Sequence, residues 1–341
     1  MPLPTPQGEL APTSSANGPQ SQFRAGGRVL SLFSSAQHSL ILRRLAHGPV
    51  ALRDLEDTQG ISSPTALRGN IGNLIGIGAL EKRNPDGEPG VLDNALTPFG
   101  RDLLFVSAVL DVWLSRAPAE PISSEATSAK EAIRAMVSAW GSTMLRALAV
   151  RSLSVSELDD LIGSLSYPAI ARRIAAMDDA GLISAVGENG KGPAYAPTRW
   201  LREATGPLLA AMHCESQYLD GWAAPPDRID VETLFLLALP LLGSVDGVDG
   251  TCHLVIQLDG GDDRSDVAGV RATVRGGKPV SCVSTLDEAP DDWISGPASR
   301  WLTALVEGDT GELESGGRNG LSVALAEALH RRLFDAGGAS L

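Results

Sequence analysis

An internal repeat constrains the fold of this 341-residue chain more than any other feature. Residues 39–103 and 142–206 carry the same spacing of apolar residues, serine and glycine. The matched positions are Leu42, Leu45, Leu55, Ser63, Leu67, Ile71, Leu74 and Gly78 in the first copy, and Leu145, Leu148, Leu158, Ser166, Ile170, Ile174, Met177 and Gly181 in the second. Such a repeat indicates two copies of one folding unit. Two copies in one chain predict a covalent pseudo-dimer.

Each copy predicts the same order of elements, which is three helices, a hairpin and a last helix. Apolar residues three or four positions apart indicate the helices, and Gly48-Pro49 ends the first of them. Ser63 as N-cap and Pro64 in the first turn begin the third. In the first copy the predicted helices cover 38–46, 50–57, 63–77 and 98–113, and the predicted strands cover 79–83 and 94–97.

Turn-rich segments divide the chain into three predicted domains. Residues 1–28 are rich in Pro, Ser and Gly and are predicted to be a disordered tail. The predicted domains are 29–116, 130–222 and 230–336, with linkers at 117–129 and 223–229. In the last domain an apolar helix, three strands and two further helices predict a small α+β fold. The expected class is therefore mostly α with α+β, built as two tandem helical units plus a C-terminal α+β domain.

This order of elements resembles the winged helix-turn-helix plan, and its details resemble the HxlR family of bacterial regulators, relatives of the MarR and PadR groups. The resemblance is carried by ILRRLAHGP at 41–49, LRDL at 52–55, ISSPTAL at 61–67, LTPFG at 96–100 and WGSTML at 140–145. It implies that the third helix of each unit enters the major groove of DNA while the hairpin contacts the backbone. The implied DNA-binding residues are Ser63, Thr65, Arg68, Ser166, Arg172, Arg173 and Lys191.

The arginines within this set have two readings. Arg68 and Arg172 are predicted to point outward, where each either reads a guanine or holds a phosphate. The alternative is an ordinary solvated helix face. The second unit carries Arg172, Arg173 and Lys191, so we expect it to contribute more of the electrostatic attraction to DNA.

The last third of the chain is similar to the sterol carrier protein type 2 fold. The similarity is carried by DDWI at 291–294 and by Trp301, Leu302, Leu305 and Gly308. It implies an apolar tunnel for a hydrophobic small molecule, with Phe235, Trp293, Trp301 and Leu305 as ligand-binding residues. The same residues also suit an ordinary filled core, which the sequence does not distinguish from a cavity.

Charge and cysteine content limit the possible partners. Residues 226–341 carry 9 basic and 19 acidic side chains, which accounts for most of the net charge of −13. This third is a poor nucleic-acid surface, because phosphate binding needs local positive charge. Three cysteines form no disulfide framework and suit a reducing compartment. No apolar run is long enough to span a bilayer. We expect a cytoplasmic protein without a membrane partner.

The polar residues of the sequence do not follow the spacing of a catalytic or metal-binding motif. The pairs His213-Cys214 and Cys252-His253 are adjacent in sequence and lack the spacing of zinc ligands. Residues 259–263 lack the calcium-loop spacing, and the chain has no phosphate-binding glycine loop and no nucleophile elbow. We therefore expect no catalytic residues, no metal and no cofactor, and we expect that the protein is not an enzyme.

These observations favour a ligand-responsive transcriptional regulator. Two fused winged helices are expected to bind double-stranded DNA at a pseudo-palindromic operator. The C-terminal domain is expected to sense a hydrophobic small molecule, and the long apolar helices allow a homodimer. The alternative hypothesis is a protein that keeps the winged-helix scaffold but sequesters a small molecule, with little DNA binding. Glycine-rich and alanine-rich outer faces on the third helices motivate that alternative.

Overall fold

Helices and three small sheets alternate along the part of the chain that the structure describes, which confirms the α+β class. The structure is a computed structural model. It describes residues 24–57, 60, 63–84, 93–140, 142–188, 192–219, 226–245, 248–258 and 266–335. Within these ranges, no helix combines the length and the apolar character needed to cross a membrane.

The first unit contains five helices and three strands among its described residues. Its elements are α1 (Gly27–Leu32), α2 (Ala36–Leu45), β1 (Val50–Ala51), α3 (Leu52–Glu56), α4 (Pro64–Gly76), β2 (Leu80–Arg83), β3 (Asp93–Leu96) and α5 (Pro98–Leu114). The strands form an antiparallel sheet in the order β1-β3-β2. Ser63 caps α4 by accepting from the backbone N–H of Ala66 at 3.1 Å, and Thr97 caps α5 in the same way through Gly100. These caps fix where both helices begin.

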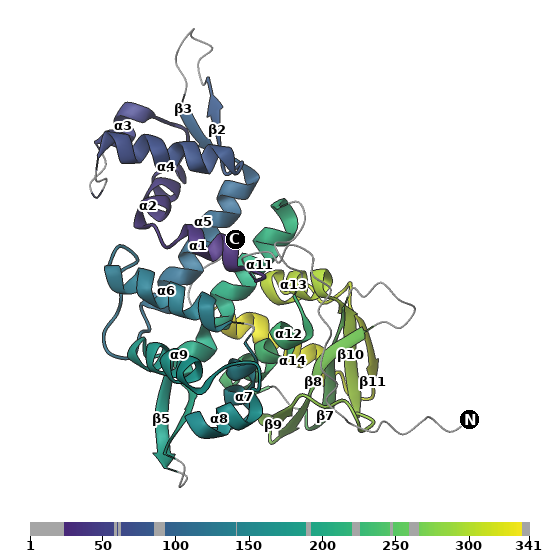
Figure 1. The fold of residues 1–341 in the computed structure, drawn as a ribbon. Coiled ribbons are helices and arrows are strands. Elements are labelled where there is room, and N and C mark those ends of the chain that lie inside the picture. Colours follow the sequence, from purple (N-terminus) through teal and green to yellow (C-terminus); the bar gives the residue numbers. More distant parts are fainter. Residues whose placement is uncertain are drawn as a thin grey trace.

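The second unit repeats this order. Its elements are α6 (Thr127–Ala139), α7 (Thr143–Val150), β4 (Leu153–Ser154), α8 (Val155–Leu161), α9 (Tyr167–Asp179), β5 (Ile183–Glu188), β6 (Pro193–Pro197), α10 (Arg199–Glu203) and α11 (Thr205–Tyr218). Its sheet order, β4-β6-β5, matches that of the first unit, and the last helix is divided into α10 and α11. The hairpins of the two units project from opposite ends of the molecule (Figure 1).

The C-terminal domain lies beside the second unit (Figure 1). Its elements are α12 (Arg228–Ala238), the 3-10 turn η1 (Leu239–Leu241), β7 (Gly250–Leu258), β8 (Asp266–Arg275), β9 (Lys278–Val283), β10 (Asp292–Pro297), α13 (Ala298–Glu307), β11 (Glu314–Gly317) and α14 (Leu321–Leu333). The sheet order is β11-β10-β7-β8-β9, with β10 parallel to β7 and the other pairs antiparallel. Helices α12, α13 and α14 pack on the sheet.

Two stacked aromatic pairs join the units where α5 packs against the last helices of the second unit. Phe99, at the start of α5, stacks on Tyr218 at the end of α11, with ring centroids 5.1 Å apart. Trp200, at the start of α10, stacks on Trp113 at the end of α5, at 4.6 Å. Phe99 and Trp200 occupy matched positions of the repeat, so the same position of each copy stacks on an aromatic ring of the other unit, although the partner residues Tyr218 and Trp113 are not themselves matched.

Three sequence predictions need correction at element boundaries. The predicted tail over 1–28 ends too late, because Ala25 is buried and Gly26 and Val29 donate backbone N–H groups to Glu215 of α11 at 2.7 and 2.9 Å. The predicted linkers 117–129 and 223–229 each end inside a helix, since α6 begins at 127 and α12 at 228. Contacts with residues far along the chain order these segments, and local composition does not reveal such contacts.

The strand predictions also need correction. The helix predicted over 50–57 begins only at Leu52, because Val50 and Ala51 pair with β3. Strands β10 and β11 were not predicted. Glycines of β11 allow it to approach β10 closely. A Cβ on Gly316 would lie 2.8 Å from the ring of Trp293, and a Cβ on Gly317 would lie 2.5 Å from the Cα of Asp292. Glycine in a strand is a weak sequence signal for a sheet.

Candidate nucleic-acid interface and junction cavity

Helix α4 presents one buried and one exposed face. Leu67, Ile71 and Leu74 are buried in the core, as predicted from their spacing. Ser63, Thr65 and Arg68 are exposed. The Arg68 guanidinium donates to the carboxylate of Glu56 in α3 at 3.0 Å. An acidic partner offsets the positive charge that a phosphate contact would use, so the first unit offers a weak electrostatic surface here.

Helix α9 has the same two faces with a different charge balance. Ile170, Ile174 and Met177 are buried, whereas Ser166, Arg172 and Arg173 are exposed. Within the described part of the chain, neither arginine has an ion pair or a hydrogen bond. Two unpaired guanidinium groups on an exposed helix face suit phosphate or guanine contact. Lys191, predicted to join them from the hairpin, lies outside the described residues.

Three of the four predicted ligand-binding residues of the C-terminal domain lie together in its core, and the fourth, Trp293, does not. Phe235 of α12 and Trp301 of α13 are fully buried and pack edge to face, with centroids 5.3 Å apart. Trp301 also donates its indole N–H to the carbonyl of Val255 at 2.8 Å, and Leu305 is buried beside it in the same core. Trp293 lies on the opposite face of the sheet and is 38% exposed. Three of the four are therefore core residues that pack against one another.

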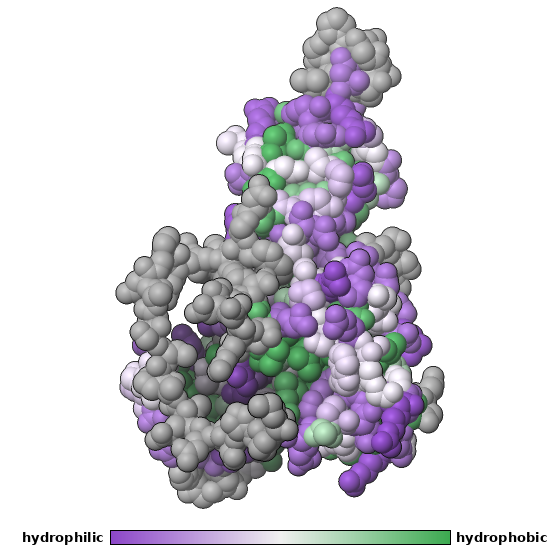
Figure 2. All heavy atoms as spheres, turned by 90° about the vertical axis from the view of Figure 1, so that its right-hand side faces the viewer, coloured by the Kyte–Doolittle hydropathy of each residue, from purple (hydrophilic) through white to green (hydrophobic). Residues whose placement is uncertain are grey.

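The outer face of this sheet is partly apolar. Strand register places Trp293, His253 and Arg271 in one row across β10, β7 and β8, and Val267 shares their face. Burial and the charge of Arg271 lower the pKa of His253. Figure 2 views this side of the molecule and has a hydrophobic strip between hydrophilic surfaces at the level of the sheet.

A cavity lies where the two units and the C-terminal domain meet. Its volume is about 640 Å³, and we call it the junction cavity. Its lining residues are Arg116, Pro118, Thr198, Arg199, Trp200, Glu203 and Arg332. They come from the end of the first unit, from the segment that follows α5, from α10 and from α14.

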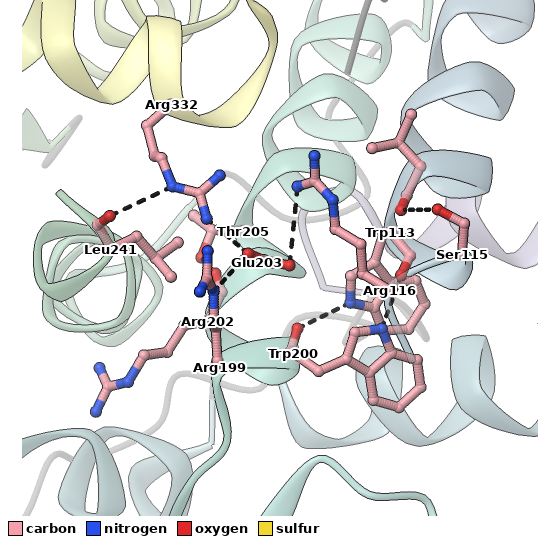
Figure 3. Close-up of polar contacts among 11 residues, drawn as sticks. Trp113, Ser115, Arg116, Arg199, Trp200, Arg202, Glu203, Thr205, Leu241 and Arg332 are labelled. Atoms are coloured by element: carbon pink, nitrogen blue, oxygen red, sulfur yellow. Dashed lines mark hydrogen bonds and ion pairs between the residues drawn. The ribbon is translucent and has the colours of Figure 1, made fainter. Parts of the chain in front are cut away.

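Three guanidinium groups surround the carboxylate of Glu203 in this cavity (Figure 3). Arg332 donates to its Oε1 at 2.6 Å and Arg199 donates to the same oxygen at 3.0 Å. Arg116 lies 3.8 Å from Oε2. Glu203 is buried, whereas the Arg199 side chain is 77% exposed. The cluster carries three positive charges and one negative charge.

The wall beside Glu203 is held by two reciprocal hydrogen bonds (Figure 3). The indole N–H of Trp113 donates to the carbonyl of Trp200 at 2.9 Å, and the indole N–H of Trp200 donates to the carbonyl of Trp113 at 2.8 Å. The rings are nearly parallel, with an interplanar angle of 9°. Both polar atoms of a buried pair are thus satisfied, and the end of α5 has a fixed position against α10.

Buried carboxylates hold the parts of the chain together at other joints. Burial raises the pKa of Glu215, although backbone N–H groups of Val29 and Gly26 oppose the shift. Burial, with the neighbouring charge of Asp227, raises the pKa of Asp230 to about 7. Glu232 of α12 accepts from Arg146 at 2.5 Å and from Arg228 at 2.8 Å.

The junction cluster was not predicted from the sequence. Arg116, Arg199, Glu203 and Arg332 are spread over more than two hundred positions and follow no motif spacing. The repeat offered one indirect signal, since Trp200, which lines the cavity, is matched to Phe99 of the first copy. The chain matches no protein-family model and no curated protein.

Proposed function

We propose that the protein is a DNA-binding transcriptional regulator in which two fused winged helices contact one operator. The observation that carries the proposal is the shared build of α4 and α9. Each follows a short strand and a helix, precedes a two-stranded hairpin, buries one apolar stripe and exposes arginine on the other face. A helix presented in this way fits the major groove.

The pairing of the units supports the same proposal. The matched residues Phe99 and Trp200 each stack on an aromatic residue of the other unit, as expected for a reciprocal arrangement of two repeated units. A protein with two-fold symmetry fits an operator whose half-sites form an inverted repeat, about one helical turn or 34 Å apart. We propose a pseudo-palindromic operator. The unequal charge of α4 and α9 predicts that its half-site under α9 is bound more tightly.

Selection from a random-sequence duplex library tests this function. The full chain is expected to enrich an inverted repeat, and the logarithm of its affinity for that site is expected to fall linearly with the logarithm of salt concentration. A slope corresponding to several phosphate contacts supports a groove-bound protein. No enrichment together with no salt-dependent binding at low ionic strength contradicts the proposal and favours a small-molecule-binding protein on the same scaffold.

A further inference from the structure

Two adjoining cavities form a groove along helix α6. One, of about 260 Å³, is lined by Arg173 of α9 and by residues at the start of α7. The other, of about 530 Å³, is lined by Ser31 of α1 and by Arg134 and its neighbours on α6. Both cavities are lined by Arg24, Ser138 and Trp140. We call the two cavities together the α6 groove.

The α6 groove is positively charged, whereas the whole chain carries −13. Arg134 and Arg173 are exposed, and within the described residues neither has an ion pair or a hydrogen bond. Arg24 is paired with Asp227 at 2.9 Å and lies 3.8 Å from Asp230, so it adds little to the local charge. Among the described residues, no Asp or Glu lines either cavity. The charges of Arg134 and Arg173 therefore have no counter-ion within the groove.

Hydroxyl groups accompany these arginines in the groove. Thr143 at the start of α7 and Ser164 in the turn before α9 are exposed and line the smaller cavity. Neither hydroxyl has a hydrogen bond to another described residue. Arginine, serine and threonine side chains are common donors to the phosphate oxygens of DNA. The groove therefore presents the set of donors that a nucleic-acid backbone accepts from.

The two unpaired arginines lie in different parts of the groove. Arg173 lines only the smaller cavity, and Arg134 lines only the larger one. A small anion offers one charged group, whereas duplex DNA carries one negative charge about every 1.7 Å along its axis. A row of phosphates can contact both arginines at once. The separation of the two charges therefore favours DNA over a small anion as the occupant.

The position of the groove shows which part of the DNA it meets. Helix α6 packs against both α9 and α1, and Figure 1 shows α6 between α4 and α9. A duplex that contacts both α4 and α9, with half-sites about 34 Å apart, passes α6 between them. We propose that the α6 groove binds the phosphate backbone of the operator between its two half-sites. This inference rests on the proposed function and adds a contact that reads no bases.

Fluorescence anisotropy of the full chain with the selected operator tests the inference. One duplex has natural phosphates throughout, and a second has uncharged methylphosphonates in place of the phosphates between the half-sites. A third has the same number of methylphosphonates outside the half-sites and controls for a general loss of DNA charge. We expect the wild type to bind the second duplex about tenfold more weakly than the first, as for loss of one charged hydrogen bond. We expect a smaller loss with the third.

Arg134→Gln assigns the loss to the groove. The Arg134 side chain is exposed and has no partner among the described residues, so its replacement leaves the fold intact. We expect Arg134→Gln to bind the natural duplex about tenfold more weakly and to lose most of its sensitivity to the spacer methylphosphonates, because the two changes remove the same contact. Arg300→Gln, an exposed arginine of α13 that lines neither cavity, is the matched control and is expected to keep the wild-type sensitivity.

The outcomes separate this inference from the proposed function. Failure of the chain to bind any of the duplexes contradicts both. Binding of the natural operator without any loss on neutralising the spacer overturns the inference alone. An equal loss in the wild type and in Arg134→Gln also overturns it, because the spacer phosphates would then contact another part of the protein.

Discussion

The two units place an arginine at the same position of the repeat but give it different partners. Arg43 of α2 bonds Asp111 of its own unit and the Ser124 hydroxyl. Arg146 of α7 bonds Glu232 of the C-terminal domain and the Ser284 hydroxyl. In both copies an arginine bonds one carboxylate and one serine. In the first unit the pair closes the unit on itself, and in the second it binds the unit to another domain.

The two copies therefore differ in how they contact the C-terminal domain and in the charge of their exposed helices. The second unit is held by α12, α13 and the junction cluster, and it also carries the unpaired arginines of α9. The first unit projects away from the C-terminal sheet (Figure 1), and its exposed Arg68 is already paired with Glu56. The copy with the stronger connection to the C-terminal domain therefore also has the more positive of the two proposed DNA-contacting helices.

The largest expected effect concerns the two aromatic stacks. Trp200 is 3% exposed and forms part of the joint beside the junction cavity. We expect Trp200→Ala to lower the free energy of unfolding by about 3–5 kcal/mol, as for other buried aromatic truncations. Tyr218→Ala, in the other stack and 38% exposed, is expected to cost only about 1 kcal/mol. Urea unfolding of both variants checks this. Equal losses would mean that the two stacks contribute alike and that the joint is symmetric.

The matched arginines provide the next comparison. Arg146→Gln leaves the buried carboxylate of Glu232 with Arg228 as its remaining arginine partner. We expect a loss of about 2 kcal/mol, less than for a fully buried pair because Arg146 is partly exposed. Arg43→Gln removes a pair whose carboxylate, Asp111, is half-exposed, and we expect a loss below about 1 kcal/mol. Denaturant titration measures both. A larger loss for Arg43→Gln would contradict the assignment of the second unit as the one bound to the C-terminal domain.

The proposed DNA contacts differ between the units in the same direction. We expect Arg172→Gln combined with Arg173→Gln to weaken operator binding about tenfold and to reduce the salt slope by about two phosphate contacts. Arg68→Gln is expected to have a smaller effect, since Glu56 already offsets its charge. Fluorescence anisotropy with the selected operator, repeated over a salt series, measures the two variants. If Arg68→Gln weakens binding more, α4 rather than α9 is the dominant interface helix.

Local pattern predicted α2, α4 and α5 of the first unit to within a few residues, and it predicted the first three strands of the C-terminal domain, whereas α1, α6 and the division of the last helix into α10 and α11 were not predicted. Helix caps and apolar spacing depend on residues that are close in sequence. The sequence alone therefore predicts the caps at Ser63 and Thr97 and the buried stripe through Leu67. The sequence does not predict the two-residue strands β1 and β4, because only their pairing with β3 and β6 defines them. The junction cavity was missed for the same reason: Arg116 and Arg332 meet only after three parts of the chain have packed.

The smallest expected difference separates the two serines that begin the interface helices. Ser63 accepts from the backbone N–H of Ala66 at 3.1 Å, whereas Ser166, at the matched position, makes no side-chain cap. We expect Ser63→Ala to lower the free energy of unfolding by about 1 kcal/mol. Ser166→Ala is expected to change it by no more than a few tenths, as at an ordinary surface site. Each variant is compared with the wild type by its urea midpoint. A cost for Ser166→Ala as large as that for Ser63→Ala would mean that α9 is capped in solution like α4. In that case the divergence between the copies lies only in their charges and in their contacts with the C-terminal domain.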